Sequence, residues 1–102
     1  MEVLIDDVRD GIGWGLVARN AKTAEAVLIK FEGLISLLGM DHDLGIGKTG
    51  HDVMKWAISC GKLPKQVCIV SGNAVGYDNM KHTLLDNGYV KEQDSNVYVK
   101  KE

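Results

Sequence analysis

The chain is poor in the residues and patterns that mark several classes of protein. It holds only two cysteines, Cys60 and Cys68, and their apolar surroundings favour reduced, buried thiols over a disulfide, a redox pair or a zinc site. No apolar run approaches the roughly 20 residues of a membrane-spanning helix. The start Met1-Glu2 lacks the basic flank of a signal peptide. We therefore expect a soluble, cytoplasmic protein with no membrane segment.

A strong excess of positive charge is also missing. The net charge of -2 argues against an extended nucleic-acid surface and against binding to an anionic membrane. The chain shows no internal repeat, low-complexity stretch or flexible linker, and its length of 102 residues is enough for one hydrophobic core but not for two. We expect a single domain over residues 1–102.

Short apolar runs alternate with helical patterns along the sequence. We expect strands over residues 2–5, 14–18, 34–40 and 67–70, and helices over about residues 21–32, 49–60 and 75–87. Strands joined by helices imply right-handed crossovers and a mostly parallel sheet. We predict an α/β, flavodoxin-like three-layer sandwich with strand order 2-1-3-4. A short strand or hairpin within residues 89–100 would add an edge.

Three of these strands stop abruptly at polar residues. Asp6-Asp7 follows the first strand, Asp41-His42-Asp43 the third, and Ser71-Gly72-Asn73 the fourth. Ligands of open parallel sheets bind beyond the carboxyl ends of the strands, and the first and third strands are neighbours in the predicted order. The four carboxylates and the imidazole should therefore share one crevice. Their mutual repulsion calls for a cation, a proton or a phosphate-bearing ligand.

A division of labour within the crevice follows from the chemistry of each group. Asp6, Asp7 and Asp41 suit a hard divalent cation, Mg²⁺ or Mn²⁺, although each of them could also be an N-cap or an ordinary loop residue. His42 suits a general acid for a departing alkoxide. Asp43 either orients His42 or caps the following turn.

Other polar groups near the crevice could hold a phosphate. Ser71 and Asn73 can donate hydrogen bonds to a phosphoryl oxygen, although both could merely cap the following helix. Lys48 and Thr49 are further candidates for phosphate binding. The segment Gly47-Lys48-Thr49 is similar to the end of a P-loop, but His42 stands where this motif requires its first glycine. We therefore reject a nucleoside triphosphatase function.

The motifs, taken in order, resemble one known family. Its elements here are Leu4-Ile5-Asp6-Asp7, Asp41-His42-Asp43-Leu44-Gly45, Thr49-Gly50 with Asp52-Val53 and Trp56, and Ser71-Gly72-Asn73 with Val75-Gly76. Together they resemble the receiver-like family proposed to process cyclic phosphates, a divergent relative of response-regulator receivers. The similarity spans about Met1 to Gly88. It implies a shortened receiver fold, a divalent metal, and a small phosphorylated nucleotide or ribose substrate such as ADP-ribose cyclic phosphate.

The sequence departs from an ordinary receiver in its tail. A receiver carries a lysine at the end of its fifth strand, whereas this tail offers only Lys91 or Lys100, neither followed by proline. Phosphorelay is therefore disfavoured. We predict a metal-dependent phosphoesterase that acts on a ribose or nucleotide cyclic phosphate. The alternative is a non-catalytic receiver-like interaction or signalling module whose acidic crevice binds metal.

Overall fold

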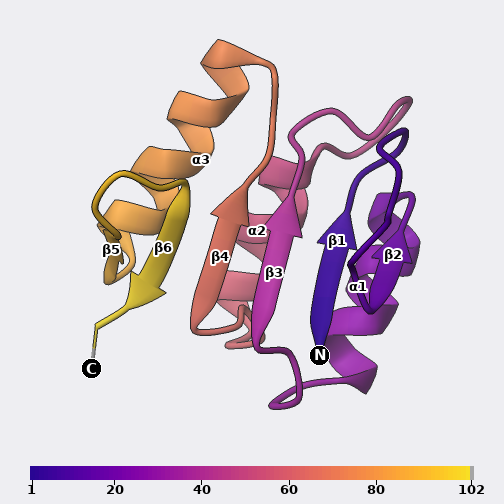
Figure 1. The fold of residues 1–102 in the computed structure, drawn as a ribbon, viewed down its shortest axis with the longest axis horizontal. Coiled ribbons are helices and arrows are strands. Elements are labelled where there is room, and N and C mark those ends of the chain that lie inside the picture. The colour runs from indigo at the N-terminus through magenta and orange to yellow at the C-terminus, as the bar shows by residue number, and fades with distance from the viewer. Residues whose placement is uncertain (102) are drawn as a thin grey trace.

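The computed structural model describes residues 1–101 as a single sheet with helices packed against it (Figure 1). Its elements in chain order are β1 (Glu2–Ile5), β2 (Leu16–Ala18), α1 (Ala21–Lys30), β3 (Leu37–Met40), α2 (Gly50–Ser59), β4 (Gln66–Ile69), α3 (Ala74–Asp86), β5 (Tyr89–Lys91) and β6 (Val97–Lys100). The types and the order of the predicted elements are confirmed. The main difference is that β2 and β3 begin later than expected, because Trp14 and Leu34 belong to the preceding turns.

The sheet has the order β2-β1-β3-β4-β6-β5. Strands β1 to β4 run parallel, while β6 pairs antiparallel with β4 and β5 pairs antiparallel with β6. The predicted receiver-like α/β class and the 2-1-3-4 order of the parallel strands are confirmed. The C-terminal hairpin folds back so that β6 lies next to β4 and β5 forms the outer edge.

The layering differs from the predicted three-layer sandwich. All three helices lie behind the sheet in Figure 1, with α1 packed on α2 and α2 on α3. The connections from β2 to β3 and from β3 to β4 cross the sheet in the same direction, and right-handed crossovers in one direction place their helices on one face. The connection from β4 to β5, which contains α3, runs in that same direction. Among the links between parallel strands, only the one from β1 to β2 runs the opposite way, and it contains no helix. Within residues 1–101, a third layer is therefore absent.

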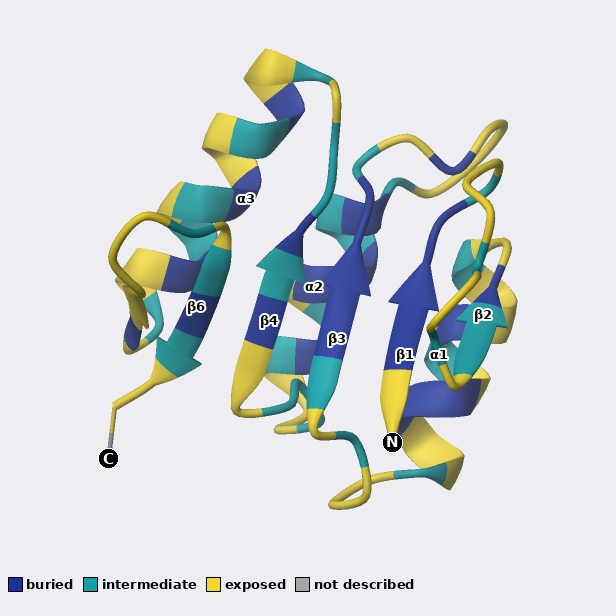
Figure 2. Ribbon diagram, in the orientation of Figure 1, coloured by how far each residue is buried: buried dark blue, intermediate teal, exposed yellow. Residues whose placement is uncertain are grey.

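The core lies between the sheet and the helices, where buried residues of both layers meet (Figure 2). Leu4 points to the other face by the alternation of strand side chains, yet it is only 1% exposed. Trp14 covers it: a Cβ added at Gly39 would overlap the Trp14 ring and touch Leu4. The loop between β1 and β2 thus shields the part of the sheet that faces away from the helices.

The two cysteines differ in how far they are buried. Cys68 is half-buried, but Cys60 is exposed, so the prediction of two buried thiols is wrong for Cys60. Cys60 follows the last turn of α2, where its thiol contacts the Trp56 carbonyl instead of the core. Among the helices of residues 1–101, none is both long and apolar enough to cross a membrane.

Candidate functional site

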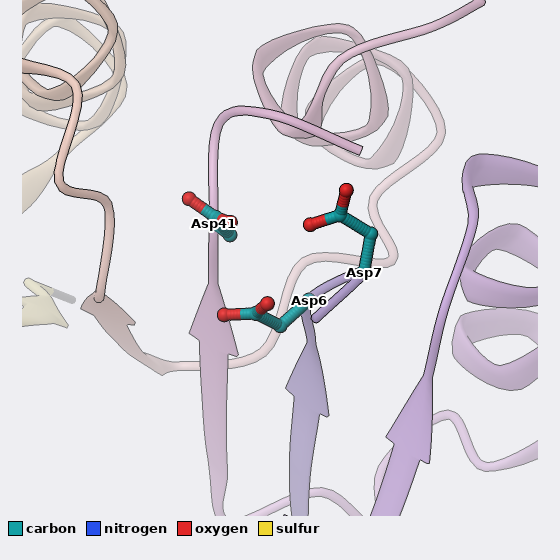
Figure 3. A group of neighbouring side chains, drawn as sticks. All are labelled: Asp6, Asp7 and Asp41. Carbon is teal, nitrogen blue, oxygen red and sulfur yellow. The ribbon is translucent and has the colours of Figure 1, made fainter. Parts of the chain in front are cut away.

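The side chains of Asp6, Asp7 and Asp41 converge at the carboxyl ends of β1 and β3 (Figure 3). Ile5 pairs with Met40 across these strands, so the next residue of each strand, Asp6 and Asp41, comes to lie side by side. One oxygen from each of the three carboxylates lies within 4.8 Å of the other two. This spacing would allow one hard cation to contact all three.

Asp6 and Asp41 are both buried, and their pKa values shift in opposite directions. Asp6 is fully buried and Asp41 is 6% exposed, whereas Asp7 is half-buried. Burial, followed by the charge of Asp6, raises the pKa of Asp41. Burial would also raise the pKa of Asp6, but hydrogen bonds from the Arg9 side chain and from the Arg9 and Val8 backbone lower it overall. The cluster therefore holds at least one firmly ionised carboxylate, Asp6.

Arg9 is a member of this site that the sequence analysis missed. Its Nη1 donates to Asp6 Oδ2 at 2.7 Å and lies 3.8 Å from Asp41 Oδ2. The available signal was an arginine three residues after an aspartate, within a turn that follows a strand. In that turn the backbone N–H groups of Val8 and Arg9 donate to Asp6 Oδ1 at 3.0 and 2.9 Å, which brings the arginine side chain back over the Asp6 carboxylate.

His42 lies beside the acidic cluster and turns toward α3. Its Nδ1 is 3.0 Å from Asp43 Oδ1, so Asp43 orients the ring. The ring also packs against Gly76 in the first turn of α3, where a Cβ would overlap it. Asn73 Nδ2 lies 3.4 Å from each oxygen of Asp43. His42, Asp43 and Asn73 therefore form one connected polar group.

A cavity of about 550 Å³ opens over these groups. Its walls are formed by Asp7, Val8, Arg9, Asp41, Asp43, Gly72 and Asn73. His42 lies between two wall residues in sequence but is not itself part of the wall, and only 17% of its side chain is exposed. The cavity thus brings together carboxylates, a guanidinium and a side-chain amide, with the imidazole next to its wall.

Ser71 and Asn73 combine a structural role with a place at the site. Ser71 hydrogen-bonds to the Asp41 carboxylate, and its hydroxyl accepts the Asn73 N–H at 3.0 Å. Asn73 is the N-cap of α3, since its Oδ1 accepts the Gly76 N–H at 2.9 Å, while its Nδ2 faces Asp43. The capping interpretation of Asn73 is therefore correct, and it leaves the side-chain nitrogen at the cavity wall.

The other predicted phosphate ligands lie outside this cavity. Lys48 forms an ion pair with Glu25 of α1, with its Nζ 3.3 Å from Glu25 Oε2. Thr49 is the N-cap of α2 and forms a capping box with Asp52. Neither residue is part of the cavity wall. The structure brings the three predicted strand-end clusters together but does not join this segment to them.

The tail lysines are also far from the carboxylates in the fold. Lys91 lies on the outermost strand, β5. Lys100 ends β6, where its N–H bonds to the Lys65 carbonyl next to the start of β4. Because β6 is antiparallel to β4, Lys100 lies where β4 begins, at the end of the strands opposite to the crevice. The described residues that form the cavity wall include no lysine, and Arg9 is the cation nearest to Asp6.

Comparison with known proteins assigns this arrangement to a family. No curated protein and no solved structure matches the chain at a significant level. The family described as cyclic-phosphate processing receiver domain matches residues 1–86. The matched region runs from β1 to the end of α3 and includes every residue of the cavity wall. The chain therefore belongs to the family of cyclic-phosphate processing receiver domains.

Proposed function

We propose that this domain is a metal-dependent phosphoesterase that opens a cyclic phosphate on a ribose or a nucleotide, as in ADP-ribose cyclic phosphate. The observation that carries the proposal is the convergence of Asp6, Asp7 and Asp41 next to the hydrogen-bonded pair of His42 and Asp43. A binding module has no need of an oriented imidazole beside an acidic cluster. The family match supports the class of substrate.

The donor atoms of the cluster fit a divalent cation. All three side chains offer carboxylate oxygens, the ligands that Mg²⁺ and Mn²⁺ prefer, and the cavity leaves room for water and a phosphate. The Arg9 guanidinium already lies against Asp6 and near Asp41, so the carboxylates hold a cationic group in the structure itself. A bound divalent cation would supply charge neutralisation of the phosphate and acidification of a water molecule for in-line attack.

The protein groups around the cavity would perform the remaining steps. Asp43 occupies Nδ1 of His42, which leaves Nε2 to hold the proton that passes to the departing ribose oxygen. The Asn73 side-chain nitrogen would donate to a phosphoryl oxygen, and Ser71 would keep Asp41 and Asn73 in place. The N-terminus of α3 adds a favourable dipole for an anion. Lys48 and Thr49 have no part in this proposal, because they are engaged elsewhere.

The decisive experiment is a phosphorus NMR screen of nucleoside and ADP-ribose cyclic phosphates, with Mg²⁺, with Mn²⁺ and with a chelator. We expect one substrate to be converted to a phosphomonoester only in the presence of metal. Asp41→Asn should abolish this conversion. The matched control is Asp86→Asn, an equivalent substitution at an exposed residue at the opposite end of α3. Metal binding without conversion of any cyclic phosphate would instead support the non-catalytic receiver-like module.

A further inference from the structure

Both oxygens of the Asp6 carboxylate are already engaged. Oδ1 accepts the backbone N–H groups of Val8 and Arg9 at 3.0 and 2.9 Å, which satisfies its two acceptor positions. Oδ2 accepts the Arg9 guanidinium at 2.7 Å. Because the two backbone bonds belong to the turn itself, Oδ2 is the oxygen that can be released to bind an ion.

The same guanidinium also faces Asp41, at the carboxyl end of β3. Arg9 Nη1 lies 3.8 Å from Asp41 Oδ2, so it is placed between carboxylates of β1 and β3. A dication bound to these two carboxylates would lie close to Nη1, and two positive charges at such a distance repel strongly in a partly buried site. Arg9 and the metal would thus compete for the same oxygens.

We propose that Arg9 is a built-in counter-cation of the crevice, which a divalent metal must displace from Asp6 Oδ2 in order to bind. The proposal rests on the metal site of the proposed function but not on the hydrolytic reaction. It adds a regulatory element to that site, because the metal affinity is then set by an exchange of cations and not by the carboxylates alone.

The exchange requires the Arg9 side chain to move while its backbone stays in place. The backbone is held on both sides, since Arg9 N–H donates to Asp6 and the Arg9 carbonyl accepts Arg19 Nη1 at 2.6 Å. Arg19 Nη1 also contacts the Asp6 carbonyl at 3.3 Å. The Arg9 side chain is 45% exposed and borders the cavity, so a change of rotamer can take the guanidinium away from Asp6 without unfolding the turn.

This role has a signature that a purely structural ion pair lacks. Removing the Arg9 guanidinium leaves a fully buried Asp6 carboxylate without its charged partner, and the metal-free protein should lose stability. The same removal leaves Asp6 Oδ2 open to the metal, and the affinity for metal should rise. Removing a residue that only maintains the shape of the site would lower both the stability of the metal-free protein and its affinity for metal.

The test compares Mg²⁺ binding by isothermal titration calorimetry with the melting temperature of the metal-free protein, for the wild type and three variants. Arg9→Gln should bind Mg²⁺ on the order of tenfold more tightly and melt at a lower temperature without metal. Arg9→Lys keeps a cation within reach and should return the affinity toward that of the wild type. Lys22→Gln removes an exposed positive charge from α1 and controls for long-range effects, which physiological salt largely screens.

The outcomes separate this proposal from the proposed function. If Arg9→Gln binds Mg²⁺ no more tightly than the wild type, the exchange is refuted while the metal site stands. If Lys22→Gln shows the same gain as Arg9→Gln, the effect is one of general charge and the exchange is again refuted. If neither the wild type nor Arg9→Gln binds Mg²⁺ or Mn²⁺, both the exchange and the metal site of the proposed function fail.

Discussion

The contact between His42 and Gly76 leads to a prediction about stability. The effect of Gly76→Ala on the free energy of unfolding should change sign when the His42 side chain is removed. Alanine is a better helix former than glycine by about 1 kcal/mol, so replacing a helical glycine by alanine usually stabilises a protein. At Gly76, however, a Cβ would lie 2.7 Å from His42 Cδ2 and 2.8 Å from His42 Cβ. The second atom is attached to the backbone, so a ring rotation cannot clear it. Gly76→Ala should therefore destabilise the wild type by about 1 to 3 kcal/mol, as overpacking does.

The assay is urea unfolding of the four proteins of a double-mutant cycle with His42→Gly. The three nearest atoms to the added Cβ all belong to the His42 side chain, and His42→Gly removes every one of them. In that background Gly76→Ala should become stabilising, by up to about 1 kcal/mol. An equal loss of stability from Gly76→Ala in both backgrounds would refute the packing of His42 on α3, and with it the orientation that the proposed acid role uses.

Further substitutions and a change of pH should distinguish effects on metal binding, on catalytic turnover and on folding stability. Asp41→Asn should abolish the rise in melting temperature caused by Mg²⁺, which for the wild type at about 100 times the dissociation constant corresponds to roughly 2.7 kcal/mol. It should leave the metal-free protein equally or more stable, because burial and the Asp6 charge raise the pKa of Asp41 and so oppose its ionised form. His42→Ala should keep its metal affinity in calorimetry but lose about 10² to 10⁴-fold in turnover followed by phosphorus NMR, and Asp43→Asn should lose about 10 to 100-fold. Acetyl phosphate should leave the intact mass of the protein unchanged, and a phosphoryl adduct on Asp41 would contradict the expectation that phosphorelay is disfavoured. Burial raises the pKa of Tyr89 to about 12, so the stability contributed by its neutral phenol is complete below pH 10.0 and lost as the pH rises toward 12. Urea unfolding should show a smaller alkaline loss in Tyr89→Phe, and identical pH profiles would contradict this burial effect.

The position of the acidic crevice could be predicted from the sequence because it depends on backbone topology alone. A strand order that makes β1 and β3 neighbours places the residues after Ile5 and Met40 side by side, whatever their side chains are. Asp6 and Asp41 occupy these two positions, and Asp7 follows within reach of both. The roles assigned to these residues stay predictions, since convergence shows where charge gathers and not what it binds.

Side-chain partners were not predictable in the same way. Lys48 is next to the site in sequence, but it pairs with Glu25 on the neighbouring helix, a contact that depends on how α1 and α2 pack. Arg9 belongs to a loop with no periodic pattern, and its placement follows from a turn closed by two backbone hydrogen bonds to Asp6. Such choices depend on local geometry that apolar periodicity does not report.

The placement of all three helices on one face of the sheet follows from features that the sequence already contains. The sequence leaves no room for a helix between β1 and β2, and this is the one link between parallel strands that runs in the opposite direction. Handedness then requires the remaining helices to share a face. Helices on both faces would need a helix in that first connection.

The loop that replaces this helix connects the fold to the site. From one end it covers Leu4 and Gly39 with Trp14, so the sheet is shielded on the face that has no helix. From the other end it returns Arg9 to Asp6, while the hairpin that replaces a parallel fifth strand carries Lys100 to the far edge. A lysine on a strand is held at a fixed place in a sheet, whereas Arg9 is carried by a loop and has a half-exposed side chain. The cation at the crevice can therefore leave its carboxylates without disturbing the sheet, which is the property that exchange with a metal demands.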